Sequence, residues 1–156
     1  MILKTLCDYL DHESIRYTVI SHSPAFTAQE IAAASHISGR ELAKTVILRI
    51  DGELAMAVVP ASYRVDLELL GELSSAVRIE IAHEADFRDV FQGCETGAMP
   101  PFGNLFDMPV HVADELTNDE YIAFNAGSHT ELIQLRYADF ERLVHPRVLD
   151  FAAVAR

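Results

Sequence analysis

A lysine inside an apolar run is the residue of this sequence best placed to do chemistry. Lys44 lies near the start of the run Leu42–Ile50, and the chain contains only one other lysine, Lys4. An amine in such a run must reach solvent, find a partner or line a cavity. A partly buried amine could have a lowered pKa, or present a point charge to a phosphate or carboxylate. The structural alternative is a stem that packs on the strand while the amine reaches solvent.

A second candidate is the loop from Gly97 to Gly103, with the sequence G-A-M-P-P-F-G. Its two adjacent prolines remove two backbone donors and fix two φ angles, while the glycines permit sharp turns and close approach of a ligand. We call this segment the proline loop. It could form one rigid wall of a pocket, and the alternative is a rigid structural turn.

A third candidate is the segment Asn125-Ala-Gly-Ser-His129, which joins two expected strands. Consecutive backbone N–H groups around a glycine can form a nest that binds an anion or an oxyanion. His129 could act as an acid, a base or a hydrogen-bond donor near neutral pH. The alternative is an ordinary hairpin turn.

The remaining histidines and cysteines carry no metal signature, since the chain lacks H-E-x-x-H, H-x-H and Cys/His pairs at zinc spacing. No Walker loop or G-x-G-x-x-G is present, so we expect no cofactor and no metal. Cys94 is expected to be a small packing residue. With only Cys7 and Cys94, a reducing cytoplasm is the expected location. No run reaches the ~18 apolar residues of a membrane span.

The charge balance bears on the class of partner. A formal net charge of −12 argues against broad electrostatic capture of nucleic acid, which requires clustered Lys and Arg. The nearest approach to a basic patch is the set Arg40, Lys44, Arg49 and Arg64. The simplest interpretation of the excess of acids is solubility.

The elements that must position these residues follow from periodicity and turn chemistry. Asp51-Gly52 lies between two apolar runs, which predicts a tight hairpin over 42–60 whose strands are central in a sheet. We also expect strands over 16–20, 77–81, 109–113, 121–125 and 130–136, and helices over 2–13, 27–34, 67–73, 83–91 and 137–144. The chain after Pro146 is expected to be a tail. Residues 1–156 are thus expected to form one compact α+β (mixed α/β) domain, with a central mixed sheet of about six or seven strands and short helices around it.

Taken in order, three stretches resemble the YbaK/prolyl-tRNA-synthetase-associated domain family. They are A-K-T-V-I-L (43–48), G-A-M-P-P-F-G (97–103) and F-N-A-G-S-H-T-E-L-I-Q-L (124–135). The opening helix and S-H-S-P-A-F-T (21–27) extend the resemblance over nearly the whole chain. It implies a YbaK-like editing domain that hydrolyses mischarged aminoacyl-tRNA in trans. Members of the family typically clear tRNA(Pro) carrying alanine or cysteine.

The resemblance also implies roles for individual residues. Lys44 matches the family's strand lysine, which is thought to bind the 3′ end of the tRNA or the aminoacyl group. The backbone of Gly127, Ser128 and His129 would hold the ester carbonyl. The residues expected to form the substrate pocket are Gly97, Met99, Pro100, Pro101, Phe102, Gly103 and Asn125.

An aminoacyl ester is already activated, so its hydrolysis requires positioning and oxyanion stabilisation more than a strong nucleophile. Water, or the thiol of a cysteine substrate, could attack. The expected partner is the 3′ acceptor end of a mischarged tRNA, with an aminoacyl-tRNA synthetase as an optional second partner, no membrane, and an oligomeric state that the sequence does not fix. The alternatives are a non-catalytic module that binds a small aminoacyl- or nucleotide-like ligand in the same pocket, and a purely structural or regulatory protein.

Overall fold

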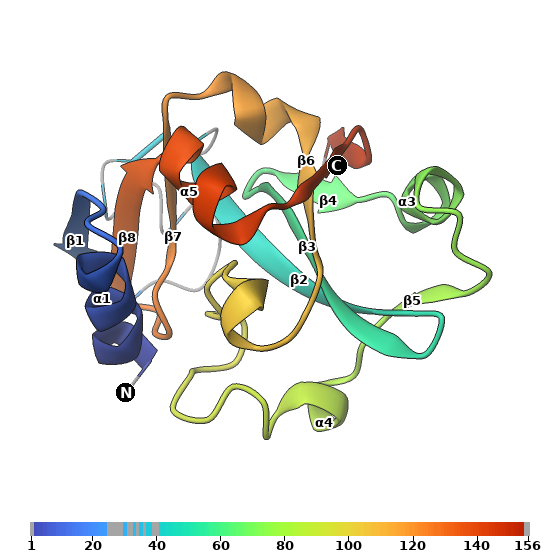
Figure 1. The fold of residues 1–156 in the computed structure, drawn as a ribbon, viewed down its shortest axis with the longest axis horizontal. Helices are drawn as coiled ribbons and strands as arrows, with labels where there is room; N and C mark the ends of the chain where they lie inside the picture. Colours follow the sequence, from blue (N-terminus) through green and yellow to red (C-terminus); the bar gives the residue numbers. More distant parts are fainter. Residues whose placement is uncertain are drawn as a thin grey trace.

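An eight-stranded mixed sheet forms the centre of the computed structural model, which describes residues 2–24, 30, 33, 35, 37–38 and 41–154 (Figure 1). The strand order is β1-β8-β7-β2-β3-β6-β9, and β5 pairs with β2. The strands are β1 (Tyr17–Ser21), β2 (Leu42–Ile50), β3 (Glu53–Pro60), β5 (Ile79–Ile81), β6 (Val110–Ala113), β7 (Tyr121–Asn125), β8 (Glu131–Arg136) and β9 (Arg147–Leu149). A separate pair joins β4 (Tyr63–Val65) to β10 (Ala152–Val154). The expected mixed α/β fold is confirmed, with a slightly larger sheet.

The central hairpin forms as its D-G pair predicts. Asp51 has φ 49° and Gly52 has φ 87°, and two positive φ values are what a type I′ turn requires. The pairing of β2 with β3 runs from Ile50–Glu53 to Ala43–Pro60. Along its other edge β2 pairs in parallel with β7, so β2 lies in the middle of the sheet.

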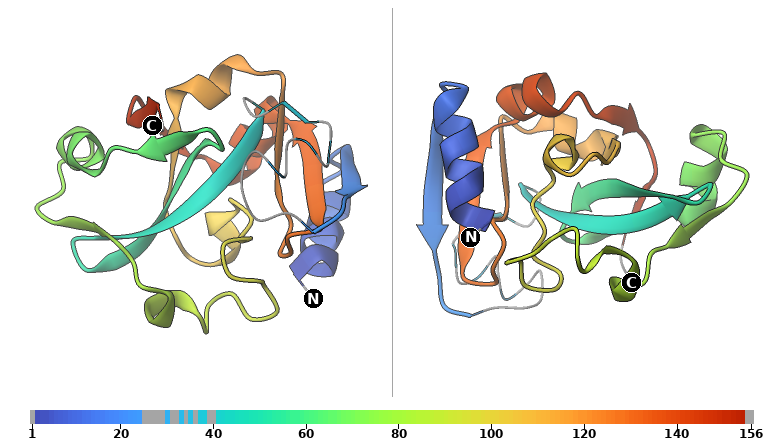
Figure 2. Two further views of the ribbon diagram at one scale, coloured as in Figure 1. Left: turned by 180° about the vertical axis from the view of Figure 1, so that it is seen from behind. Right: turned by 60° about the horizontal axis from the view of Figure 1, so that its bottom comes forward.

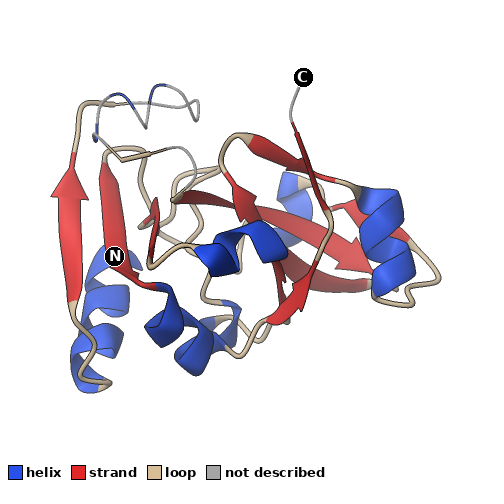
Figure 3. Cartoon of the chain, turned by 90° about the horizontal axis from the view of Figure 1, so that it is seen from above, coloured by secondary structure: helices blue, strands red, loops and turns tan. Residues whose placement is uncertain are grey.

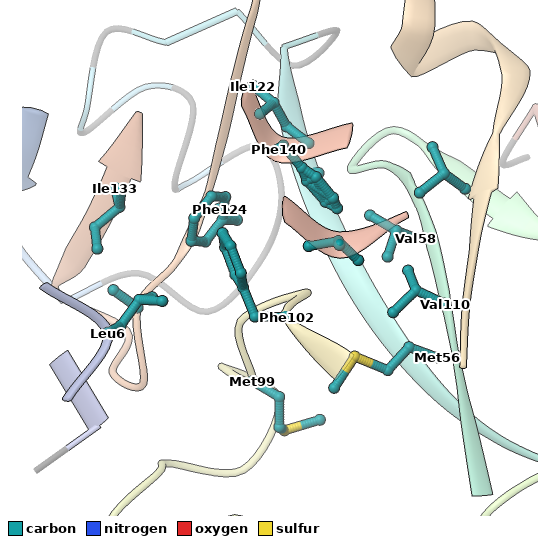
Figure 4. Packing of buried hydrophobic residues seen from close by; sticks show 14 of the residues in the cluster. Leu6, Met56, Val58, Met99, Phe102, Val110, Ile122, Phe124, Ile133 and Phe140 are labelled. Carbon is teal, nitrogen blue, oxygen red and sulfur yellow. The ribbon is translucent and has the colours of Figure 1, made fainter. Parts of the chain in front are cut away.

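The sheet separates two apolar layers. Side chains alternate along β2, so that Ala43 and Ile47 join the main core cluster while Leu42 and Leu48 face the other side. The main cluster contains the aromatic rings of Phe102, Phe124 and Phe140, which are far apart in the sequence (Figure 4). Fully burying one such large side chain contributes about 1.5–3 kcal/mol. We call the two sides the main-core face and the opposite face.

The helices cover both faces of the sheet (Figures 1 and 2). α1 (Ile2–His12) and α5 (Tyr137–Val144) pack their apolar sides on the main-core face, through residues such as Leu6 and Phe140. α3 (Leu67–Leu73) packs Leu70 on the opposite face. The Asp66 carboxylate caps α3 by accepting a hydrogen bond from Leu69 N–H (3.1 Å). Figure 3 shows that α3 and α1 lie at opposite ends of the molecule.

Some elements differ from those expected. The tail after Pro146 forms β9 and β10, and 63–65 forms β4. The helix expected over 83–91 is only α4 (Glu84–Phe87), because Val90 N–H bonds to Phe87 O and the chain tightens into turns. Those turns bury Phe91 against Phe106, with ring centroids 4.6 Å apart. The helix expected from Thr27 to Ala34 lies mostly outside the described residues.

Two short 3-10 helices, Gly103–Leu105 and Asp114–Asn118, complete the described fold. Within the described residues, no helix combines the length and the apolar character needed to cross a bilayer.

Candidate active site

Four hydrogen bonds join residues 95–98, which lead into the proline loop, to the turn that follows β7. Glu95 N–H donates to Gly127 O (2.8 Å), and Gly127 N–H donates to Ala98 O (2.9 Å). The backbone N–H of His129 donates to Glu95 Oε2 (2.7 Å), and its ring Nε2 bonds to Thr96 O (2.7 Å). Two of the three stretches that the sequence singled out therefore form one unit, which we call the loop–turn unit (95–98 with 127–129).

The imidazole of His129 is held in one orientation by this unit. A carbonyl oxygen only accepts, so Nε2 must carry the hydrogen of its bond to Thr96 O, and in the neutral ring Nδ1 carries the lone pair. Gly97 lies beside the ring with φ +83°, and a Cβ built there would be 3.7 Å from His129 Cε1. The left-handed backbone at this position favours glycine.

Fewer backbone N–H groups of the turn are available to bind a substrate than the sequence suggests. Of the three backbone N–H groups expected to hold an ester carbonyl, that of Gly127 is bonded to Ala98 O and that of His129 to the Glu95 carboxylate. For the third, Ser128 N–H, no acceptor lies among the described residues. Ser128 N–H is thus the donor of this turn that a substrate could reach without displacing another group.

Lys44 lies on the opposite face of the sheet, near the end of β7. It pairs with Val59 of β3, and the residue before it, Ala43, pairs with Phe124 of β7. Ala43 and Phe124 both belong to the main core, so by alternation Lys44 and Asn125 follow them on the opposite face. Lys44 and Asn125, a residue expected to line the substrate pocket, therefore lie on the same face of two neighbouring strands.

The surroundings of Lys44 are those of an amine without a counter-ion. Its side chain is half-buried, and burial lowers the pKa of Lys44 below the ordinary value of 10.5. Among the described residues no carboxylate lies within ion-pair distance of its amine. The Oδ1 atom of Asn125 is also buried without a hydrogen-bond partner in the described chain. Both polar groups thus lack a polar partner among the described residues, and Asn125 Oδ1 is a buried acceptor.

The later part of the proline loop is anchored in the main core. Phe102 is 0% exposed, and its ring centroid lies 5.4 Å from that of Phe124 and 5.5 Å from that of Phe140 (Figure 4). Met99 is buried in the same cluster. Phe102 therefore lies on the sheet face away from Lys44, so the structure does not bring these two predicted site residues together.

Pro100, Pro101 and Gly103 are buried as well. A Cβ added at Gly103 would collide with Met108 O and Val110 Cγ2, so only glycine fits between the loop and β6. This part of the loop is buried and closely packed against β6.

The basic patch expected around Lys44 is not formed by Arg49. Five residues further along β2, Arg49 lies roughly 17 Å away at a strand rise of about 3.3 Å, and on the main-core face. Its guanidinium pairs with Asp86 (3.4 Å) and donates to Gly52 O (2.8 Å). Arg64 is exposed on β4, and Arg40 lies outside the described residues. Arg49 is thus close to Lys44 in sequence but not in space.

Two clefts flank the loop–turn unit. One has a volume of about 150 Å³ and is lined by Leu3, Gly93, Glu95, Ala126, Gly127, Ser128 and Glu131. The other has a volume of about 540 Å³ and is lined by Pro24, Glu95, Thr96, His129 and Thr130. Glu95 lines both, although sequence reasoning missed it. Its only mark in the sequence is its position two residues before Gly97.

Two other side chains limit the chemistry of the site. Burial, assisted by the neighbouring Glu95 carboxylate, raises the pKa of the Cys94 thiol to about 11, so it packs against the core as a neutral thiol. In the described part of the chain, no three His, Cys, Asp or Glu side chains come close enough to hold a metal ion.

The chain matches known proteins over most of its length. The model of the family described as the aminoacyl-tRNA editing domain matches residues 22–143, which include Lys44 and the loop–turn unit. The Multifunctional Ser/Thr-tRNA deacylase ProXp-y of Escherichia coli (strain K12) is 29% identical over 155 residues, covering 94% of this chain and 90% of that protein. The Prolyl-tRNA editing protein ProX of Acetoanaerobium sticklandii is 24% identical, covering 93% of this chain and 92% of its own length.

Solved structures share the fold. One described as a candidate trans-editing enzyme for prolyl tRNA synthetase superimposes with a TM-score of 0.81 at 18% identity, covering 96% of this chain and 95% of that chain. The hypothetical protein APE2540 gives a TM-score of 0.83 at 19% identity, covering 94% and 98%. At these identities the likeness concerns the arrangement of strands and helices.

Proposed function

We propose, because this chain belongs to the aminoacyl-tRNA editing domain family, that it is a trans-acting deacylase for tRNA mischarged with a small amino acid. The observation that carries the proposal is a half-buried lysine with no ion-pair partner among the described residues, in a chain whose loop–turn unit is held by four hydrogen bonds. Lys44, near the start of β2, and Asn125, the last residue of β7, lie on the same face of neighbouring strands, and the turn begins directly after Asn125.

The reaction is hydrolysis of an ester. Water attacks the carbonyl carbon, the bond from that carbon to the ribose oxygen of the terminal adenosine breaks, and the ribose oxygen takes up a proton. Free amino acid and uncharged tRNA leave. Ser128 N–H is the donor of the turn proposed to meet the oxyanion, and protonated Lys44 adds a positive charge near the ribose and the last phosphate. Because the ester is already activated, fixed donors and correct placement supply most of what is needed.

For the substrate we propose tRNA(Pro) carrying alanine or cysteine, as the resemblance implies. Serine and threonine esters are the next to test, because a relative of 29% identity bears the name Ser/Thr-tRNA deacylase. A small rigid site excludes larger side chains by steric overlap. The optional synthetase partner would supply affinity for the tRNA body.

The direct test is a deacylation panel with tRNAs carrying alanine, cysteine, serine, threonine and proline. We expect release of at least one small amino acid, and a fall in kcat/KM of roughly 100-fold in Lys44→Ala, the typical cost of removing an electrostatic stabiliser. Lys4→Ala is the matched control, because Lys4 is exposed and paired with Asp8 (2.7 Å) on α1. Release of no amino acid, or undiminished release by Lys44→Ala, would contradict the proposal.

A second candidate is a non-catalytic module that binds an aminoacyl- or nucleotide-like ligand. One observation favours it: two of the three turn donors already have acceptors within the chain. A stable analogue of the tRNA 3′ end, 3′-aminoacylamino-adenosine, distinguishes the two. A raised melting temperature with this analogue, combined with no release from any ester in the panel, would support the binding module.

A further inference from the structure

Two carboxylates flank the turn: Glu131 Oε1 accepts a hydrogen bond from Ser128 Oγ (3.3 Å), and Glu95 belongs to the loop–turn unit itself. One carboxylate oxygen, Oε2, accepts the His129 backbone N–H at 2.7 Å, and the Glu95 backbone N–H is bonded to Gly127 O. The residue is exposed, and it lines both clefts beside the turn. Its position is therefore fixed by the loop–turn unit, while the carboxylate itself remains accessible.

The charge of Glu95 is not balanced by a strong cation. Among the described residues, no Lys or Arg forms an ion pair with it. Its negative charge is felt locally, since it contributes to the raised pKa of the Cys94 thiol. A carboxylate at this point repels phosphate and opposes a growing oxyanion at His129 N–H.

The chemistry of the substrate indicates what such a carboxylate could bind. An aminoacyl-tRNA is a polyanion whose amino acid carries one cation near the ester, the α-ammonium. In an amino acid the α-nitrogen lies about 2.5 Å from the carbonyl carbon, as the N–Cα and Cα–C bond lengths and the angle between them require. If Ser128 N–H holds the ester carbonyl, the α-ammonium comes within reach of the Glu95 carboxylate, which is bonded to the N–H of the next residue, His129. Hydrogen bonds between such charged partners are stronger than neutral ones.

We propose that Glu95 binds the α-ammonium of the esterified amino acid, and so restricts the reaction to esters with a free, protonated amine. The inference rests on the proposed deacylase function and adds a specificity-determining residue to it. Esters lacking that charge, such as hydroxyacyl-tRNA and N-acylated aminoacyl-tRNA, are then poor substrates. Phosphate groups of the tRNA are kept to the Lys44 side of the site.

The test compares alanyl-tRNA with lactyl-tRNA, in which a hydroxyl of similar size replaces the ammonium. With the wild-type protein we expect kcat/KM for the alanyl ester to be at least about 10-fold higher, the effect of losing one hydrogen bond between charged groups. In Glu95→Gln the ratio of kcat/KM for the alanyl ester to kcat/KM for the lactyl ester should fall towards 1, mainly because the alanyl ester is hydrolysed more slowly. The glutamine oxygen can still accept the His129 N–H, so the turn is retained.

Glu72→Gln is the matched control, because it removes one exposed carboxylate from α3 at the other end of the molecule and should leave the preference unchanged. Equal hydrolysis of both esters by the wild-type protein would overturn the role of Glu95 and leave the deacylase function standing. An equal loss on both esters in Glu95→Gln would overturn it too, in favour of a purely structural contact. If Glu95→Gln does not fold, the wild-type protein is tested with N-acetylalanyl-tRNA instead. Slow hydrolysis of this ester relative to alanyl-tRNA would support the role of Glu95, and equal hydrolysis would overturn it. Hydrolysis of no ester at all would mean that the proposed function itself fails.

Discussion

At the scale of single residues, the chain's two lysines are in opposite electrostatic environments. Burial lowers the pKa of Lys44 below 10.5. The pKa of Lys4 is raised above 10.5, mainly by its hydrogen bond to Asp8 and by the charge of that carboxylate. The sequence marks Lys44 as unusual, but that no ion pair reaches it among the described residues depends on how the strands pair. Each lysine thus serves as a control for the other.

Competitive acylation of the amines across pH measures this difference. Only the neutral amine reacts, so a lowered pKa moves the onset of labelling to lower pH and a raised pKa moves it to higher pH. We expect the labelling midpoint of Lys44 below 10.5 and that of Lys4 above it, read by mass spectrometry of the two lysine-containing peptides. Coincident midpoints would contradict the environment assigned to Lys44.

At the scale of elements, local patterns predicted well wherever the chain's own chemistry decides the outcome. The D-G hairpin, the helix over Leu67–Leu73 and the hairpin joining β7 to β8 follow from turn residues, capping and periodicity. The strands β9 and β10 could not be predicted, because each has three residues and is defined by pairing with distant β6 and β4. Glu95 was missed for a similar reason, since its partner His129 is 34 residues away.

The close approach of the proline loop to β6 predicts a specific weakness at Gly103. In Gly103→Ala the new Cβ meets Met108 O and Val110 Cγ2, and we expect a loss of stability of about 1–3 kcal/mol from overpacking. Gly93→Ala is the comparison: its φ of +81° is strained for alanine, but no atom lies within 4 Å of the new Cβ. Urea unfolding of both variants should show the larger loss for Gly103→Ala. A smaller loss there than at Gly93 would mean that the loop can shift away from β6.

At the scale of the whole molecule, the charge distribution limits how tRNA can be bound. The net charge is −12, and of the basic residues grouped in the sequence with Lys44, Arg49 faces away and is paired with Asp86. Few phosphates can therefore be neutralised. Composition alone predicts weak electrostatic attraction to tRNA, whereas the position of Arg49 away from Lys44 depends on the alternation of side chains along β2.

The expected consequence is a weak response to salt. A protein making 6–10 phosphate contacts loses about 10³–10⁵ in affinity between 50 and 200 mM salt. For this chain acting alone, we expect KM for aminoacyl-tRNA to rise by no more than about 10-fold over the same range, which is the response to salt of a protein that contacts one or two phosphates. Steady-state deacylation at several salt concentrations measures the slope. A steep rise would show that basic residues gather on a surface that binds the tRNA body.

The bond from His129 N–H to the Glu95 carboxylate also provides a spectroscopic reporter. A short, charge-assisted hydrogen bond moves an amide proton downfield in an NMR spectrum and protects it from exchange with solvent. This bond measures 2.7 Å and joins the two halves of the loop–turn unit. A ligand that draws the carboxylate towards its own cation will weaken this bond. The His129 amide resonance therefore reports occupancy of the site directly, in a protein that carries no tryptophan to do so by fluorescence.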